Sequence, residues 1–298
     1  MIRVFYFKNN YGDELSAYLI SKLSGEKVVS CTPFSWKRLI LDIMICIRDV
    51  LFLKGFHNFV FSYSKKSKII FAVGSIIGLA KENCIVWGSG ITFAKDEIVP
   101  SVDIRAVRGP LTLKRLASCG YNTDHIKMGD PGLLLPLVYP ARKKKIYKMG
   151  VIAHNNDFAS VKRALKGWEK EILLISLKTK NQTVEDITEM ICSCEMIFST
   201  SLHGLIISHA YGIPALRIDS ENIPGDGSKF SDYFLSVGIE PYKPFLLKEL
   251  LNIWNEGVSM FFSTHASSAL PPDGLVEERQ QQLLESAPFP LKKSAVEK

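Results

Sequence analysis

The sequence predicts an α/β protein of two Rossmann-like domains facing a cleft, and three observations support this fold class. Short runs rich in Val, Ile and aromatic residues alternate with segments of helical length. Several of these runs end in Gly or a polar residue. The 298 residues are enough for two medium-sized domains with their own cores. Such alternation is typical of βαβ units and a mostly parallel sheet.

The first half of the chain holds one series of these segments. A helix is expected from about 13 to 23, and strands are expected at 2–7, 27–30, 58–62, 68–74, 84–90 and 103–109. Ligands of open parallel sheets bind beyond the carboxyl ends of the strands. The residues that follow each strand are therefore the first candidates for function.

A second series begins after Pro140. Strands are expected at 149–154, 171–177, 196–200 and 213–218, and helices at 158–168, 184–194 and 202–211. We expect domains at 1–140 and 141–264, followed by a peripheral helix and a flexible tail at 265–298. The basic run at 141–148 is interpreted as a solvated linker or as an edge that faces phosphate.

The composition is that of an ordinary globular protein, with 47% hydrophobic and 22% charged residues. It excludes collagen-like, coiled-coil and wholly disordered chains. The six cysteines lack zinc-site spacing, and we expect reduced thiols in a cytoplasmic protein. The N-terminus begins with a β-like run and lacks the features of a signal peptide, so secretion is not expected.

The most apolar stretch runs from Leu39 to Leu53 and contains three charged residues, so it is too short and too polar to span a bilayer. It is either a buried amphipathic helix or a helix on a membrane surface, assisted by nearby Lys65, Lys66 and Lys68.

Positive charge is concentrated in the first half of the chain. Residues 1–140 hold 18 Lys and Arg against 11 Asp and Glu, whereas residues 141–298 hold 19 of each. No nucleic-acid-binding motif accompanies this charge, and no nucleic-acid partner is expected. An anionic membrane surface or a phosphate-bearing substrate fits it better.

The junction between a strand and a helix at 196–218 is the sharpest local feature. Ser199, Thr200 and Ser201 stand at the predicted helix N-terminus, where free backbone N–H groups favour an anion. His203 follows in the first turn, and Gly204 allows close backbone approach. The alternative for His203 is a hydrogen-bonded core histidine, and the nearby His209 is expected to serve packing.

The segment NNYGDEL at 9–15 directly follows the first strand. Gly12 permits a tight turn there. Asp13 and Glu14 either cap the following helix, or Asp13 binds or deprotonates sugar hydroxyls.

Four further candidates lie at strand ends or turns. Arg108 opens a helix with Gly109 and Pro110 and can clamp a phosphate or carboxylate. The others are Asp130 in a turn, His154 at the end of a strand and Lys229 in a Gly-rich loop. Each of these residues can equally form a turn or cap a helix. Only their joint position at strand ends favours a binding or catalytic site.

Taken together, these motifs resemble the polysaccharide pyruvyl transferase family over about residues 1–245. The matching segments, in order, are NYGDEL, GSG at 88–90, RGPLT at 108–112, GDPGLLLP at 129–136, His154, SLHGLIISHAYGIPAL at 201–216 and GSKFSDYF at 227–234. The resemblance implies a fold similar to GT-B glycosyltransferases. It also implies transfer of pyruvate from phosphoenolpyruvate onto two hydroxyls of a sugar, as a ketal, in a bacterial exopolysaccharide or capsule repeat unit.

Site roles follow from this resemblance. His203, Asp13 and Asp130 are expected to be catalytic, and Arg108 and Lys229 to hold the charged donor. Substrate binding is further expected of Ser201, His154, Ser199, Thr200 and Gly204. No redox cofactor and no metal are expected for this chemistry. Many family members have Arg-Leu-His-Gly where this chain has Ser201-Leu202-His203-Gly204, so Arg108, Lys229 or Arg217 must supply the missing charge.

The expected partners are phosphoenolpyruvate and a lipid-linked oligosaccharide or polysaccharide acceptor, with possible peripheral contact at the inner membrane face. Two other functions compete with this interpretation. One is a GT-B glycosyltransferase that uses a nucleotide sugar, since a fold does not fix a function. The other is a non-catalytic scaffold in polysaccharide assembly.

Overall fold

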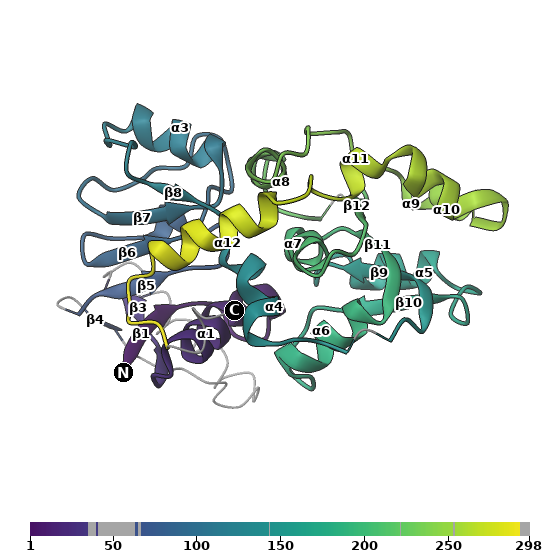
Figure 1. Ribbon diagram of the computed structural model, residues 1–298, viewed down its shortest axis with the longest axis horizontal. Helices are drawn as coiled ribbons and strands as arrows, with labels where there is room; N and C mark the ends of the chain where they lie inside the picture. The colour runs from purple at the N-terminus through teal and green to yellow at the C-terminus, as the bar shows by residue number, and fades with distance from the viewer. Residues whose placement is uncertain are drawn as a thin grey trace.

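The computed structural model describes residues 1–34, 40, 63–64, 67–142, 144–220, 222–252 and 254–292. They form two parallel β-sheets with helices around them, which confirms the α/β fold class and is consistent with two Rossmann-like domains (Figure 1). The helix expected at 39–53, the strand at 58–62, and Lys65 and Lys66 lie outside the described residues.

The first sheet has six strands in the order β2-β1-β5-β6-β7-β8, and every pair is parallel. Its strands are β1 (Ile2–Phe5), β2 (Val28–Ser30), β5 (Ile69–Phe71), β6 (Cys84–Trp87), β7 (Asp103–Val107) and β8 (Lys127–Met128). A separate parallel pair is formed by β3 (Thr32–Pro33) and β4 (Tyr63–Ser64). The helical segments of this part are α1 (Tyr11–Ser24), η1 (Ile77–Leu79), α3 (Pro110–Ser118), η2 (Pro131–Leu134) and α4 (Leu135–Val138).

The second sheet has four parallel strands in the order β10-β9-β11-β12. They are β9 (Tyr147–Ala153), β10 (Ile172–Ser176), β11 (Cys194–Ser199) and β12 (Ala215–Arg217). Its helices are α5 (Phe158–Ala164), α6 (Val184–Cys192), α7 (Leu202–Ala210) and α8 (Ser228–Ser236), followed by α9 (Leu247–Asn252), α10 (Trp254–Thr264) and α11 (Ala266–Ala269). The central strands β9 and β11 are mostly buried, which explains the nearly continuous apolar runs at these positions of the sequence.

The basic run at 141–148 connects α4 to β9, is largely exposed where the structure describes it, and is partly structured. Strand β9 begins at Tyr147, two residues earlier than expected. The Lys145 ammonium donates to the carbonyl oxygens of Cys192 at 3.0 Å and Cys194 at 2.6 Å, where α6 ends. A cation is stabilised there by the last carbonyl groups of the helix. Helix α6 ends at Cys192, two residues before the predicted end, because Cys194 already belongs to β11.

The carboxyl edges of the two sheets face one another. The backbone N–H of Tyr11, at the start of α1, donates to the Leu177 carbonyl after β10 at 2.9 Å. The backbone N–H of Ala94, beyond β6, donates to the Asp226 carboxylate beyond β12 at 3.0 Å. The loops that follow strands of one sheet therefore contact those of the other.

Each sheet has a point where the strand order reverses. In the first sheet this switch point lies between β1 and β5, and in the second it lies between β9 and β11. Crevices at such points are where open parallel sheets bind ligands. Because the carboxyl edges face one another, the topology alone places both crevices in the region between the sheets.

The C-terminal segment packs against both parts of the molecule. Helix α12 (Leu275–Glu285), the yellow helix of Figure 1, follows the expected Pro-Pro-Asp-Gly turn. The Trp87 indole donates to the Leu283 carbonyl at 2.9 Å and its ring meets Phe289 edge to face. The Arg279 Nε donates to the Ser236 carbonyl of α8 at 2.7 Å. The segment up to Lys292 is therefore anchored by contacts with both parts of the molecule.

The five described cysteines are free thiols. Among the described residues, no helix is long and apolar enough to cross a membrane.

Candidate active site

Helix α7 begins directly over the second switch point, at the predicted junction. Ser201 is the N-cap residue in an extended conformation. The Ser199 hydroxyl donates to the Ser201 carbonyl at 2.8 Å and accepts from the Ser201 N–H at 3.0 Å, which fixes the turn. A side chain at Gly204 would collide with the Ser199 hydroxyl and Ile152. Ser199, Ser201 and Gly204 thus shape the turn that presents His203.

The His203 imidazole contacts Gly12 in the first turn of α1. A Cβ atom at position 12 would overlap the ring at Nδ1. Gly12 is therefore needed for this close approach between the two parts, and the expected tight turn is wrong because Gly12 lies within α1. His203 Nε2 is shielded from solvent and has no hydrogen-bond partner among the described residues.

The electrostatic surroundings keep His203 neutral. Burial lowers its pKa to about 3, and the nearby charges of Arg108, Lys229 and His154 add to this shift. A neutral imidazole donates a hydrogen bond from one ring nitrogen and accepts one at the other. An anion bound beside these cations would raise the pKa again.

His154 and Thr200 join the two strands that flank the second switch point. The backbone N–H of His154 donates to the Thr200 hydroxyl at 2.8 Å. The Asn156 N–H donates to His154 Nδ1 at 3.2 Å, so the neutral ring carries its proton on Nε2. Burial and the Lys229 charge lower the pKa of His154. His154 is therefore a hydrogen-bond donor at this site.

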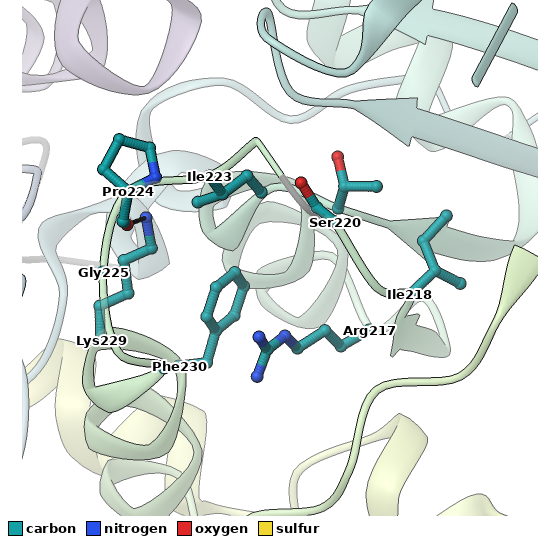
Figure 2. A pocket seen from close by; sticks show the side chains of 10 residues that line it. Arg217, Ile218, Ser220, Ile223, Pro224, Gly225, Lys229 and Phe230 are labelled. Atoms are coloured by element: carbon teal, nitrogen blue, oxygen red, sulfur yellow. Dashed lines mark hydrogen bonds between the residues drawn. The ribbon is translucent and has the colours of Figure 1, made fainter. Parts of the chain in front are cut away.

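A small pocket opens beside Thr200, between β12 and the start of α8. Figure 2 shows its cations, with Lys229 and Arg217 on either side of the Phe230 ring. The Arg217 Cζ lies 3.8 Å from the ring centre and the Lys229 Nζ lies 5.6 Å from it. The Lys229 ammonium also donates to the Pro224 carbonyl at 2.9 Å. The Gly-rich loop and the first turn of α8 thus hold both cations in place.

The pocket concentrates positive charge. Burial, together with the charges of Arg108 and Arg217, lowers the pKa of Lys229 to about 8. Burial also lowers the pKa of Arg217, which Asp219 partly offsets. No acidic side chain is among the described residues that line the pocket. Such a site favours an anionic ligand over solvent.

Arg108 is fully buried and hydrogen-bonded within the protein. Its Nε and NH2 atoms lie 3.2 and 3.1 Å from Asp232 Oδ2 of α8, while NH1 donates to Ser75 at 2.6 Å and NH2 to the Ile91 carbonyl at 2.7 Å. Asp232 also accepts from Thr112 at the start of α3. The guanidinium therefore ties the two parts together, and it acts on Lys229 and His203 through its charge.

Asp13 lies at the first switch point. The helix cap is supplied by Asn10, whose side chain accepts from the Gly12 N–H at 3.1 Å, while Glu14 accepts from the Asn9 N–H at 2.8 Å. Asp13 Oδ1 lies next to Gly74, just beyond β5. Burial and the Glu14 charge raise the pKa of Asp13 to about 7. Asp13 therefore exchanges a proton near neutral pH.

Asp130 is inside the protein, with no exposed surface. Its Oδ1 accepts from the Gly132 N–H at 2.9 Å and caps η2. Oδ2 has no hydrogen-bond partner among the described residues. Burial raises the pKa of Asp130 to about 6, although Arg108 acts in the opposite direction.

The structure thus places the predicted residues in two groups. His203, His154, Thr200 and Lys229 lie together, while Arg108 and Asp130 are enclosed at the junction between the sheets, from where the Arg108 charge still acts on His203 and Lys229. His209 is buried in contact with Tyr233 and the Ala215 carbonyl, a packing role. The sequence predicts Arg217 only as a source of charge, although its position at the end of an apolar strand is the same signal that favours Arg108.

No metal site is evident in the part of the chain that the structure describes, where no group of three or more His, Cys, Asp or Glu could hold an ion.

Two facing Rossmann-like domains, with histidines and cations at the point where their strand ends meet, define a two-domain α/β protein with a candidate site for an anionic ligand. The family model for polysaccharide pyruvyl transferases matches residues 10–222, and the chain belongs to this family. An uncharacterized protein of Acanthamoeba polyphaga mimivirus is 32% identical over 190 residues. That match covers 61% of this chain and 66% of the relative, slightly less than two thirds of its length. The description of this family names pyruvyl transfer and polysaccharides.

Proposed function

We propose that this protein transfers the pyruvyl group of phosphoenolpyruvate onto two hydroxyls of one sugar in an exopolysaccharide or capsule repeat unit, forming a ketal. The observation that carries this proposal is the pocket of Lys229 and Arg217. It concentrates cations next to His203 and has no lining carboxylate among the described residues. Phosphoenolpyruvate carries a phosphate and a carboxylate, which these cations complement.

The donor is proposed to lie between this pocket and the start of α7. Lys229 and Arg217 would bind its phosphate, and Thr200 and the backbone at the N-terminus of α7 would add hydrogen bonds. Arg217 then supplies the charge that many family members carry in place of Ser201. Arg108 would contribute through its electric field and by holding Ser75 and Asp232 in position.

The reaction requires one protonation and two deprotonations. A proton is added to the methylene carbon of the donor, which becomes a methyl group and leaves C2 electrophilic. One sugar hydroxyl attacks C2 and loses its proton, the bond from C2 to the phosphate oxygen breaks, and a second hydroxyl then attacks C2. The proton of the first hydroxyl replaces the one consumed, and that of the second leaves with phosphate. No redox step occurs.

Two groups are suited to these transfers. Asp13, with a pKa of about 7, is proposed to exchange protons with the sugar hydroxyls. His203 is neutral in the free protein and is proposed to become a proton donor once the phosphate offsets the surrounding cations. The protonated Nε2 of His154 would donate a hydrogen bond to an oxygen atom of phosphoenolpyruvate. We propose that Asp130 positions η2 beneath α7, because its carboxylate is enclosed.

The test is a calorimetric titration of phosphoenolpyruvate into the purified protein, with a panel of nucleotide sugars in parallel. Saturable phosphoenolpyruvate binding that is weakened by about 30-fold in Arg217→Ala is the expected result. Binding of a nucleotide sugar alone would replace this proposal with a glycosyltransferase. His203→Ala should retain donor binding but form no ketal, and unchanged ketal formation would rule out its catalytic role.

The acceptor is proposed to be lipid-linked, which places the enzyme in the cytoplasm at the inner face of the membrane. The excess positive charge of residues 1–140 supports this location, because anionic lipids attract basic surfaces. Sedimentation with vesicles containing anionic lipid, compared with neutral vesicles, tests it. Equal recovery of the protein with both kinds of vesicle would contradict it.

A further inference from the structure

Two polar atoms beyond the second sheet are buried without a hydrogen-bond partner among the described residues. They are Asn155 Oδ1, after β9, and Thr179 Oγ1, after β10. Buried polar atoms of proteins are nearly always hydrogen-bonded, so each exception requires an explanation. Neither residue caps a helix or belongs to the cationic pocket.

The topology brings these two atoms to one edge. Strands β9 and β10 are neighbours, and Ala153 pairs with Ser176, so Asn155 and Thr179 both follow closely after this pair. The hydrogen bond from the Tyr11 N–H to the Leu177 carbonyl fixes the first turn of α1 at the same edge. That turn carries Asp13.

The same turn connects this edge with the reacting groups. Gly12 contacts His203, which also has an unpaired buried nitrogen, Nε2. Three unpaired polar atoms thus follow three adjacent strands, β10, β9 and β11, at the edge that the first turn of α1 contacts through Leu177 and His203.

The chemistry of these atoms selects their ligand. An amide oxygen only accepts hydrogen bonds, and so does an ionised carboxylate such as Asp13. Fully ionised phosphoenolpyruvate also has acceptors only, so it cannot satisfy Asn155 Oδ1. A sugar hydroxyl both donates and accepts. The acceptor-rich edge therefore matches a polyol, as the cationic pocket matches an anion.

We infer that Asn155 and Thr179 hold the acceptor sugar, with Asn155 Oδ1 accepting from one hydroxyl and Thr179 Oγ1 bonded to another. This inference rests on the proposed function. It assigns the acceptor sugar to residues separate from those that bind phosphoenolpyruvate. The sugar would then present its reacting hydroxyls to Asp13 and His203. Both residues would determine specificity by position, since binding a hydroxyl group at a buried polar atom rejects analogues that lack it.

A groove beside the same turn gives room for a longer acceptor. It is lined by Tyr6, Lys8, Glu14, Ala17, Tyr18 and Val184. Tyrosine rings offer an apolar face to the C–H face of a sugar, and Glu14 offers a hydrogen-bond acceptor to its hydroxyls. An oligosaccharide bound by Asn155 and Thr179 would continue along this groove.

The experiment uses saturation-transfer NMR on the full chain, with the methyl glycosides of glucose, galactose, mannose and N-acetylglucosamine at millimolar concentration. The variants are Thr179→Val, which is nearly isosteric, and Asn155→Leu. Thr179→Ser is the matched control, because it keeps the hydroxyl. We expect transfer to at least one glycoside in the wild type and in Thr179→Ser, and a several-fold loss in the other two variants. The melting temperature of Thr179→Val should be equal to or above that of the wild type, because an unpaired buried hydroxyl is removed.

Phosphoenolpyruvate affinity separates this inference from the proposed function. In calorimetry it should stay within about twofold of the wild type in all three variants. Unchanged glycoside signals in Thr179→Val would overturn the inference, and so would the absence of any glycoside signal in the wild type. A parallel loss of phosphoenolpyruvate affinity would also overturn it. If phosphoenolpyruvate does not bind at all while glycosides bind through Asn155 and Thr179, the donor assignment fails and the sugar site stands.

Discussion

The junction of Arg108 with Asp232 and the pocket of Arg217 with Lys229 each contain a strand-end arginine. One arginine is paired with a carboxylate and the other lines a pocket. Both arginines stand at the end of a buried parallel strand, β7 and β12. Arg108 is fully buried and lies 3.1 Å from the Asp232 carboxylate, whereas Arg217 packs on the face of Phe230 and lines a pocket. The first cation is neutralised within the protein and the second is available to a ligand.

The difference follows from what the neighbouring elements supply. Helix α8 brings Asp232 to Arg108 and Lys229 to the pocket, on the same short helix. The first turn of α8 thus adds the Lys229 charge to the pocket, and the next turn supplies Asp232 to the ion pair with Arg108. A strand-end arginine is therefore available for binding only where no carboxylate from another element reaches it.

The largest effect that tests this comparison is on stability. Arg108→Ala leaves Asp232 buried without its cation and should lower the free energy of unfolding by about 3–5 kcal/mol. Arg217→Ala removes only the contact with Phe230 and should lower it by about 1 kcal/mol. Urea denaturation of both variants measures the difference. Equal losses would show that the two arginines do not differ in structural role.

The next effect is on donor affinity. Arg217→Ala should weaken phosphoenolpyruvate binding by about 30-fold, because a charge-assisted hydrogen bond contributes about 2 kcal/mol. Arg163→Ala is the matched control, since Arg163 is exposed on α5 and outside the pocket. Calorimetry on both variants checks this result. A similar loss in Arg163→Ala would indicate a general charge effect.

Asp13 provides a third test, at the opposite switch point. Its pKa is raised from 3.8 to about 7, so folding disfavours its ionised form, and this cost grows as the pH rises from 4 to 7. Asp13→Asn should therefore stabilise the protein by about 1–2 kcal/mol at pH 8, a value reduced for partial exposure, and by little at pH 4. Thermal melts at both pH values measure it. Destabilisation at pH 8 would show that the carboxylate is stabilised by a partner.

The smallest effect concerns Lys229. Its pKa of about 8 means that the free protein loses this charge as the pH rises above 8, so phosphoenolpyruvate affinity should fall several-fold between pH 7 and pH 9. Lys229→Arg keeps its charge throughout this range and should remove the dependence. Calorimetry at both pH values compares the two proteins. An equal fall in the variant would assign the pH dependence to another group.

Much of the architecture was predictable from local sequence. Apolar runs that end in Gly or polar residues predicted most strands of both sheets, because strands of parallel sheets are buried on both faces. The segment Ser199–Gly204 predicted the start of α7 within one residue, because hydroxyl residues before an apolar helical run are an N-terminal signal. The packing of the C-terminal segment was less predictable from the sequence, because it depends on contacts with Trp87 and Leu23, which are distant in sequence.

The sequence by itself determined the fold class, the strand ends and the residue types available there, because these depend on local hydrophobic periodicity and capping. Only the tertiary structure decided which residues are free to act. Asp232 lies 124 positions from Arg108, and Gly12 is needed because His203 arrives from the other sheet. Asn155 and Thr179 belong to no sequence motif. That their side-chain oxygens are buried without a hydrogen-bond partner is visible only in the tertiary structure. Burial and pairing are properties of contacts distant in sequence, which no local pattern encodes.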